Sequence, residues 1–200
     1  MSEQQLAIDI TAASGTQRLD GVGGAQALAG APSGDGIATA AASGSSGGIV
    51  RVSAADTKAT STPTVTTSVG NNATLTARDI DVESNAIGLV FASSANSGGG
   101  LVSIGDAAAQ VGVSTTSVVN IGSSASLTAE HDASIVSTSS ENANAISDTN
   151  GGGLVSFAKA RAKALVDYVS KVVIGAAANV KAGNALLAES RSDLDAIATA

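Results

Sequence analysis

Apolar and polar residues alternate at every second position over much of this chain. Between residues 157 and 175, each even position from 158 to 164 is alanine, and all the charged residues stand at odd positions. Successive side chains of a strand point to opposite faces, so the pattern predicts a strand with one small face and one charged face. Alanine, lysine and arginine also favour helices, but the equivalent earlier segments do not read as helices, and one of them contains Pro63.

Other segments are predicted as short strands because they are rich in Val, Ile and Thr and are separated by Gly, Asn, Ser and Asp. They cover residues 73–84, 116–122, 125–129 and 133–139. The parity of the alternation then assigns the faces: Val111 and Ala160 are expected to point inward, whereas Ala108 and Lys159 are expected on the surface.

Two sequence motifs recur along the chain at the same spacing. The first motif is GGIVRVS at residues 47–53, and it recurs as GGLVSIG at 99–105 and as GGLVSFA at 152–158. The second resembles GNNATLTA and occupies residues 70–77, 122–129 and, more weakly, 175–182. Both motifs shift first by 52 and then by 53 residues, which a single residue inserted between Ala129 and Gly151 explains. The chain is therefore predicted to be a repeat protein.

The repeats favour an all-β fold, a right-handed parallel β-helix (β-solenoid), in which each unit packs mainly on its own copies. We expect about three rungs in each repeat of ~52 residues, and about 11 rungs spanning roughly 50 Å at the usual strand spacing. Residues 1–35 are expected to form a divergent repeat or cap. Residues 36–200 are expected to form one continuous domain with repeats near 36–87, 88–140 and 141–200, as a fragment of a longer protein.

The composition agrees with a narrow interior. The chain is 44% hydrophobic but only 2% aromatic, with Phe91, Phe157 and Tyr168 as its aromatic residues. Large aromatic side chains usually dominate compact cores, and an interior of small and β-branched residues does not need them. This composition argues against a conventional enzyme domain with a deep apolar pocket.

Charge and cysteine content exclude further classes. The net charge is −7 and the only basic cluster is Lys159, Arg161 and Lys163, so nucleic-acid binding is not expected. The absence of cysteine excludes disulfides and thiolate metal sites. No apolar run approaches the roughly 20 residues of a membrane-spanning helix, and no signal peptide is apparent, so we expect any export signal to lie outside this chain.

A family resemblance emerges from the repeated motifs. GGGLVSIG followed by alternating Ala and Val, and then V-x-I-G and A-x-L-T-A, resembles the shaft repeats of filamentous-haemagglutinin-like, two-partner-secreted exoproteins and of leukotoxin-type filamentous adhesins. The resemblance covers roughly residues 36–200. It implies a β-helical rod that is secreted or exposed on a bacterial surface, with no catalytic residues in the shaft. The amino-terminal secretion domain of such families carries Asn-Pro-Asn motifs, which this chain lacks.

Several residues could carry chemistry, and each has a simpler structural explanation. His131 beside Asp132, with serines nearby, matches a hydrolase triad by residue type only. Asp79, Asp81 and Glu83 would share one face of a strand, as a Ca²⁺ site or a carbohydrate-active acid pair requires. A solvated outer face, with Ile80 and Val82 inside, is the preferred interpretation.

Other motifs are weaker still. Asp193 and Asp195 form a further carboxylate pair, and the glycine-rich segment 21–30 lacks a dinucleotide fingerprint because Gln26 stands at the third glycine position. The repeats do not predict the threonine ladder of an ice-binding protein. Thr60, Thr62 and Thr64 align with Gly112, Ser114 and Thr116 and then with Leu165, Asp167 and Val169. Asn72-Ala73-Thr74 is a formal glycosylation sequon.

The sequence thus predicts a non-enzymatic structural shaft segment with no catalytic, cofactor-binding or metal-binding residues and no cofactor. Its expected partners are neighbouring rungs of the parent chain or other copies joined end to end, and a host-cell or glycan receptor, without membrane insertion. A carbohydrate-binding or carbohydrate-active β-helix and the stalk of a secreted toxin are the alternatives.

Overall fold

The computed structural model describes residues 7–12, 15–19, 36–47 and 50–200, and all the elements within these ranges are strands. Most of the predicted cap at residues 1–35, including the glycine-rich segment 21–30, lies outside the described residues. No helix that could span a membrane occurs in the described ranges.

The strands form three sheets in which every pair of neighbours is parallel. Sheet 1 contains β1 (Ala7–Ala12), β3 (Gly36–Gly47), β7 (Asp79–Gly99), β10 (Asp132–Gly152) and β13 (Ala185–Thr199). Sheet 2 contains β2 (Gly15–Leu19), β4 (Val50–Ser61), β5 (Thr64–Val69), β8 (Val102–Ile121) and β11 (Val155–Ile174). The short sheet 3 contains β6 (Thr74–Ala77), β9 (Ser126–Ala129) and β12 (Asn179–Ala182).

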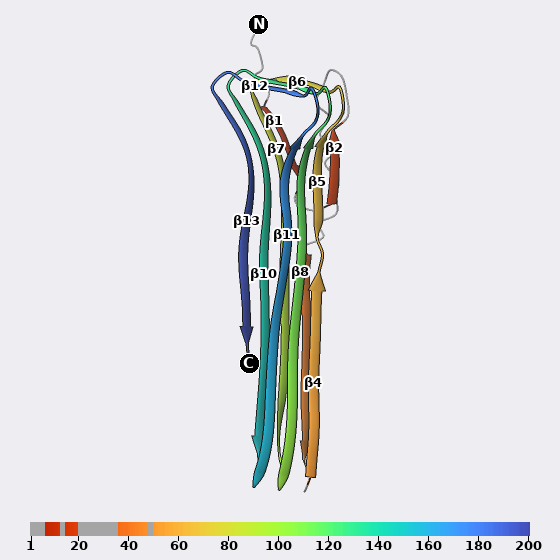
Figure 1. Ribbon diagram of the computed structural model, residues 1–200, viewed down its shortest axis with the longest axis vertical. Coiled ribbons are helices and arrows are strands. Elements are labelled where there is room, and N and C mark those ends of the chain that lie inside the picture. Colours follow the sequence, from red (N-terminus) through yellow and green to blue (C-terminus); the bar gives the residue numbers. More distant parts are fainter. Residues whose placement is uncertain (1–6, 13–14, 20–35, 48–49) are drawn as a thin grey trace.

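Sheets 1 and 2 lie face to face along the long axis of the molecule, and sheet 3 crosses one end (Figure 1). The chain runs along sheet 1, turns at the glycine-rich segment 99–101 and returns along sheet 2. It then crosses sheet 3 and enters sheet 1 again. We call β4–β7 the first repeat, β8–β10 the second repeat and β11–β13 the third repeat.

Each repeat contributes one strand position to each sheet, which corrects the expectation of about three rungs per repeat. Val102 pairs with Val50 on one side and Val155 on the other, at separations of 52 and 53 residues. Three rungs per repeat would instead pair residues about 17 apart. The predicted strands were also too short, since β7 and β10 contain 21 residues each. At ~3.3 Å per residue such strands span about 70 Å, so the long dimension follows the strands and not the stack.

The inserted residue lies where the sequence predicts it. Ala77 pairs with Ala129 at a separation of 52, whereas Ile80 pairs with Ala133 at a separation of 53. The extra residue is therefore accommodated at the corner between β9 and β10, inside the predicted interval. Both neighbouring sheets keep a regular register.

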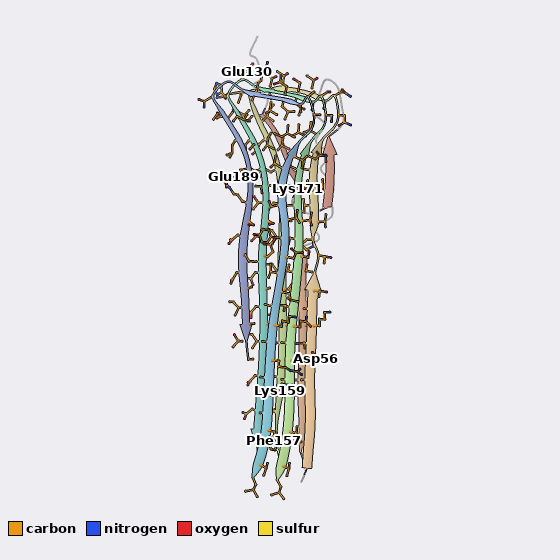
Figure 2. The ribbon with its side chains drawn as sticks, viewed as in Figure 1. Asp56, Glu130, Phe157, Lys159, Lys171 and Glu189 are labelled. Carbon is orange, nitrogen blue, oxygen red and sulfur yellow. The ribbon has the colours of Figure 1, made fainter. Side chains whose placement is uncertain are left out.

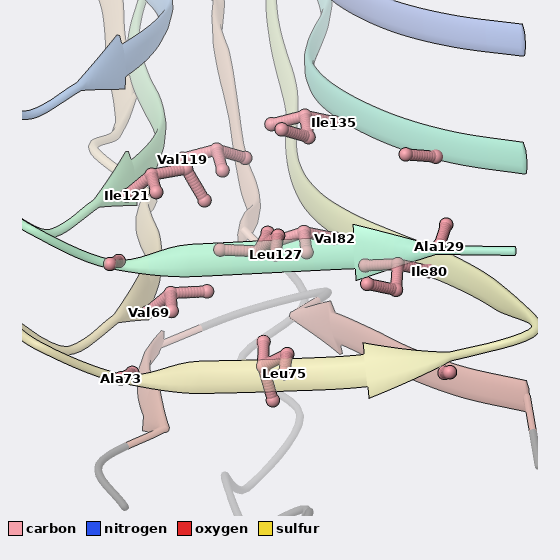
Figure 3. Packing of buried hydrophobic residues seen from close by; sticks show 13 residues of the cluster. Val69, Ala73, Leu75, Ile80, Val82, Val119, Ile121, Leu127, Ala129 and Ile135 are labelled. Atoms are coloured by element: carbon pink, nitrogen blue, oxygen red, sulfur yellow. The ribbon is translucent and has the colours of Figure 1, made fainter. Parts of the chain in front are cut away.

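The predicted faces are confirmed in the second repeat. Ala107, Ala109 and Val111 are buried, while Ala108 and Gln110 between them are partly exposed. Two large apolar clusters fill most of the interior at different heights, and Val65 and Ala86 form a third, small one. The larger one lies beneath sheet 3, where Leu75 and Leu127 meet side chains of both long sheets (Figure 3). The smaller of the two large clusters lies farther along the long sheets and contains Val90, Val111 and Val113. Alanine and β-branched residues suffice because the two sheets are close.

The three turns before sheet 3 have the same backbone conformation. Asn72, Ser124 and Ala177 each have a φ of 57°. This left-handed conformation is common for Gly and Asn and costs energy for a residue such as alanine. The turn is thus repeated even where the sequence at its tip changes from Asn to Ser to Ala.

Candidate functional site

Five inward-facing serines form a column of hydroxyl groups between the two long sheets. They are Ser84, Ser117, Ser137, Ser170 and Ser190, taken alternately from sheets 1 and 2. From Ser117 onward, each hydroxyl donates to the main-chain oxygen of the preceding serine at 2.8–2.9 Å. Ser117, Ser137 and Ser170 also lie 2.9–3.1 Å from the preceding hydroxyl.

The serine column continues through all three repeats and separates the apolar clusters by a hydrogen-bonded layer. Because its hydroxyl groups bond to main-chain oxygens, the interior tolerates them without an unpaired polar group. This column was not among the features predicted from the sequence. Its signal was serine at 84, 137 and 190 and at 117 and 170, always 53 residues apart.

Glu141 lies close to the serine column and is the one fully buried charged residue among the side chains that the structure describes, with 2% of its surface exposed. Its Oε1 accepts a hydrogen bond from the hydroxyl of Thr115, whereas Oε2 is buried without a hydrogen-bond partner. Burial raises the pKa of the Glu141 carboxyl. The Ser139 hydroxyl partly offsets this rise, and the charge of Asp193 adds to it.

His131 and Asp132 lie at the exposed corner where the inserted residue is accommodated. The Asp132 carboxylate accepts hydrogen bonds from Asn184 Nδ2 at 2.8 Å and from the main-chain N–H of Ala185 at 3.1 Å. The carboxylate of Asp79 accepts a longer one, 3.4 Å, from the N–H of Asp132. These aspartates thus connect successive repeats, a structural role that requires no triad.

The acidic trio occupies the outer face of β7. Asp79, Asp81 and Glu83 are partly exposed, while Ile80 and Val82 between them are buried, as the alternation predicts. No group of three or more acidic or histidine side chains in the described ranges is arranged to hold a metal ion.

The remaining charged candidates also lie on outer faces. On β13, Asp193 and Asp195 are exposed, and Asp195 accepts a 3.3 Å hydrogen bond from Asn142. On β11, Arg161 donates to Asp106 at 2.7 Å between exposed Lys159 and Lys163. Figure 2 shows Lys159 along the strand, well away from Glu130 at the sheet 3 end. The basic cluster is therefore partly neutralised.

The three aromatic residues occupy separate places. Phe91 is on the outer face of sheet 1, Phe157 is on the outer face of sheet 2 near the glycine turns (Figure 2), and Tyr168 faces inward on the terminal strand β11. Within the described part of the chain, the three rings do not come together in one cleft.

Shallow grooves accompany the exposed aromatic and aliphatic residues. One groove of about 260 Å³ is lined by Leu89 and Phe91 together with Thr39, Asn142 and Asn144. A groove of about 380 Å³ lies around Ile104 and Phe157. A third groove, of about 320 Å³, is lined by Thr60, Gly112 and Leu165, which pair with one another on neighbouring strands. Because glycine and leucine occupy the positions equivalent to Thr60, threonine does not form a ladder there.

The sequon of the first repeat lies at the repeated turn, where Asn72 and Thr74 are exposed and Ala73 is buried. The described surface thus offers shallow grooves and paired charges. The most regular arrangement of polar side chains in the described residues is the serine column, which lies inside. No protein-family model, curated protein or solved structure matches this chain.

Proposed function

We propose that this chain is a non-catalytic structural segment, a piece of the shaft of a secreted or surface-exposed bacterial adhesin-like exoprotein of the filamentous-haemagglutinin-like type. The observation that carries the proposal is the pairing of equivalent residues of successive repeats in all three sheets, at a constant 52 or 53 residues. Such pairing suits a right-handed β-solenoid, because parallel strand connections are right-handed in nearly all proteins.

A stack of this kind resists bending and extension through three features. Parallel main-chain hydrogen bonds join each repeat to the next, the two large apolar clusters run across repeat boundaries, and the serine column adds side-chain bonds along the stack. Most charged side chains in the described ranges lie on the outer faces or at the corners, and Glu141 is the buried exception. The mechanism is therefore mechanical, and its partners are adjacent repeats, other copies joined end to end and a receptor on a host cell.

Single-molecule force spectroscopy of the chain, held at its two ends, tests the mechanical proposal. If repeats detach one at a time, each rupture should release 52–53 residues, or about 18 nm of extended chain. Release of the whole chain in one step at low force would contradict a shaft built of separable repeats. Antibodies to the chain should also label intact cells of the source organism.

A carbohydrate-binding surface is the second candidate, favoured by the groove in which Phe91 and Leu89 lie beside Asn142 and Asn144. Aromatic rings pack against the apolar faces of sugars, and amide groups bond to their hydroxyl groups. A glycan array with the wild-type chain, Phe91→Ala and Asp81→Ala tests it. Binding lost in Phe91→Ala would support the groove, loss in Asp81→Ala would indicate the acidic trio, and no binding by the wild type would contradict both. The stalk of a secreted toxin would use the same shaft.

A further inference from the structure

Glu141 occupies a position in the stack where the other repeats have no ionisable group. It pairs with Gly88 of the first repeat and with Leu194 of the third repeat. The Cβ that an alanine would place at position 88 would overlap the side chain of Val113, so the first repeat has no room for a side chain there. The second repeat instead places a carboxyl group inside, beside the hydroxyl of Thr115.

The third repeat shields Glu141 from solvent. The corresponding inward residues of the third repeat, Leu194 and Tyr168, are 51% and 45% exposed, whereas Glu141 and Thr115 are 2% and 0% exposed. The difference arises because β11 and β13 cover the second repeat. If the third repeat detached, Glu141 would become exposed to a similar extent.

Burial and the neighbouring negative charge disfavour the charged form of Glu141, and together they outweigh the hydroxyl group of Ser139, which favours it. On β13, Asp193 adds a negative charge near Glu141. On β11, Tyr168 is the ionisable residue on the inward face, whereas Asp167 and Lys171 are on the outer face. From β7 and β8 the facing residues are Gly88, Val113 and Thr115, which carry no charge. No lysine or arginine on the inward faces described here compensates a carboxylate.

We propose that Glu141 is a proton-binding site in the interface between the second and third repeats, and that binding of this proton strengthens attachment of the third repeat. A neutral carboxyl group avoids the cost of a buried charge and its O–H can donate a hydrogen bond, whereas the carboxylate leaves a buried Oε2 unpaired. Because the attached state holds the proton more tightly than the detached state, attachment weakens as pH rises from the ordinary glutamate pKa through the raised pKa. This inference does not depend on the chain being a shaft.

Hydrogen exchange on the whole 200-residue chain between pH 4.5 and 8, corrected for the intrinsic pH dependence of exchange, tests the proposal. In the wild type, protection of the amides of β11 and β13 should fall as pH rises, about tenfold for each unit by which the pKa is raised. Glu141→Gln keeps the size of the side chain without its charge. It should remove this pH dependence and leave β11 and β13 better protected than in the wild type at pH 7.

The matched control is Glu130→Gln, which changes an exposed glutamate of the same repeat and should leave the wild-type profile unchanged. A Glu141→Gln profile with the wild-type slope, or wild-type protection that does not vary with pH, would overturn the proposal. If Glu141→Gln fails to fold, NMR titration of the wild-type carboxyl groups decides: a pKa of Glu141 no higher than the ordinary glutamate value would refute the proposal.

Discussion

The guanidinium group of Arg161 donates a 2.7 Å hydrogen bond to the carboxylate of Asp106, joining β11 to β8 on the outer face of sheet 2. About half of each side chain is exposed, so water and salt weaken the attraction between them. The same outer face carries Lys159 and Lys163, which are also exposed.

We therefore expect Arg161→Ala to lower the free energy of unfolding by less than about 1 kcal/mol. Urea denaturation at low and high salt measures this change, and the difference between variant and wild type should shrink at high salt. A loss of several kcal/mol that persists at high salt would mean that Arg161 has a packing role beyond the ion pair.

Val111→Asp should be severely destabilising, by about 3 kcal/mol or more, because it places a charge inside the smaller apolar cluster. Ala108→Asp on the outer face of the same strand is the matched control and should change stability by about 0.5 kcal/mol or less. Ala160, which also faces inward, is partly exposed in the third repeat, so Ala160→Asp should have a smaller effect than Val111→Asp. Equal thermal shifts for Val111→Asp and Ala108→Asp would contradict the assignment of the faces.

Ser117→Ala should cost about 1–3 kcal/mol, since it removes a hydroxyl that bonds to Ser84 and leaves Ser137 without one of its partners. Ser114→Ala changes a serine on the outer face of the same strand and should be nearly neutral. Chemical denaturation of both variants measures the difference. Equal stability of the two would show that the serine column contributes no net stabilisation.

Gly88→Ala should destabilise the chain by about 1–3 kcal/mol, because the new Cβ would overlap Val113. Gly112→Ala is the control: its Cβ would lie 3.4 Å from Thr60 at the edge of a shallow groove, where the side chain can adjust. Differential scanning calorimetry should show a lower melting temperature for Gly88→Ala than for Gly112→Ala. The reverse order would argue against the close approach of the two sheets at Gly88.

Ala177→Gly should stabilise the third repeat by about 0.5–1 kcal/mol, since the left-handed conformation of Ala177 suits glycine better. Ala176→Gly, at the neighbouring exposed position, should give no gain and serves as the control. Thermal unfolding compares the two variants. A destabilised Ala177→Gly would indicate that greater freedom of the unfolded chain outweighs the relief at the turn.

The facing of side chains and the register could be predicted from the sequence, because both follow from local alternation and from the spacing of the repeated motifs. Ala109 and Val111 are inside, and Gly112 pairs with Thr60 and Leu165, as the alignment indicates. The number of strands in each repeat could not be predicted in the same way. Alternation specifies which face a residue occupies, but it does not mark where a long strand ends.

Serine contributed to this error. The predicted strand 133–139 ends at a run of serines, which are typical of turns, whereas β10 continues through Ser140 to Gly152. Ser137, inside the predicted strand, bonds to Ser117 in the interior. The same ambiguity concealed Glu141, which was not distinguished from surface acids. A polar residue can be placed in the interior only if its hydrogen-bond partner is known. For Ser137 and Glu141 that partner lies on the facing sheet, so the local sequence does not reveal it.

The corner between β9 and β10 allows the number of residues in a repeat to change without changing the strand register. One extra residue between Ala129 and Ala133 leaves sheet 3 before it and sheet 1 after it in regular pairing. Repeats of unequal length can therefore stack together, provided that the difference is confined to such a corner. This gives the chain a position at which sequence can be gained or lost, or a foreign loop grafted, while the interior of the stack stays the same.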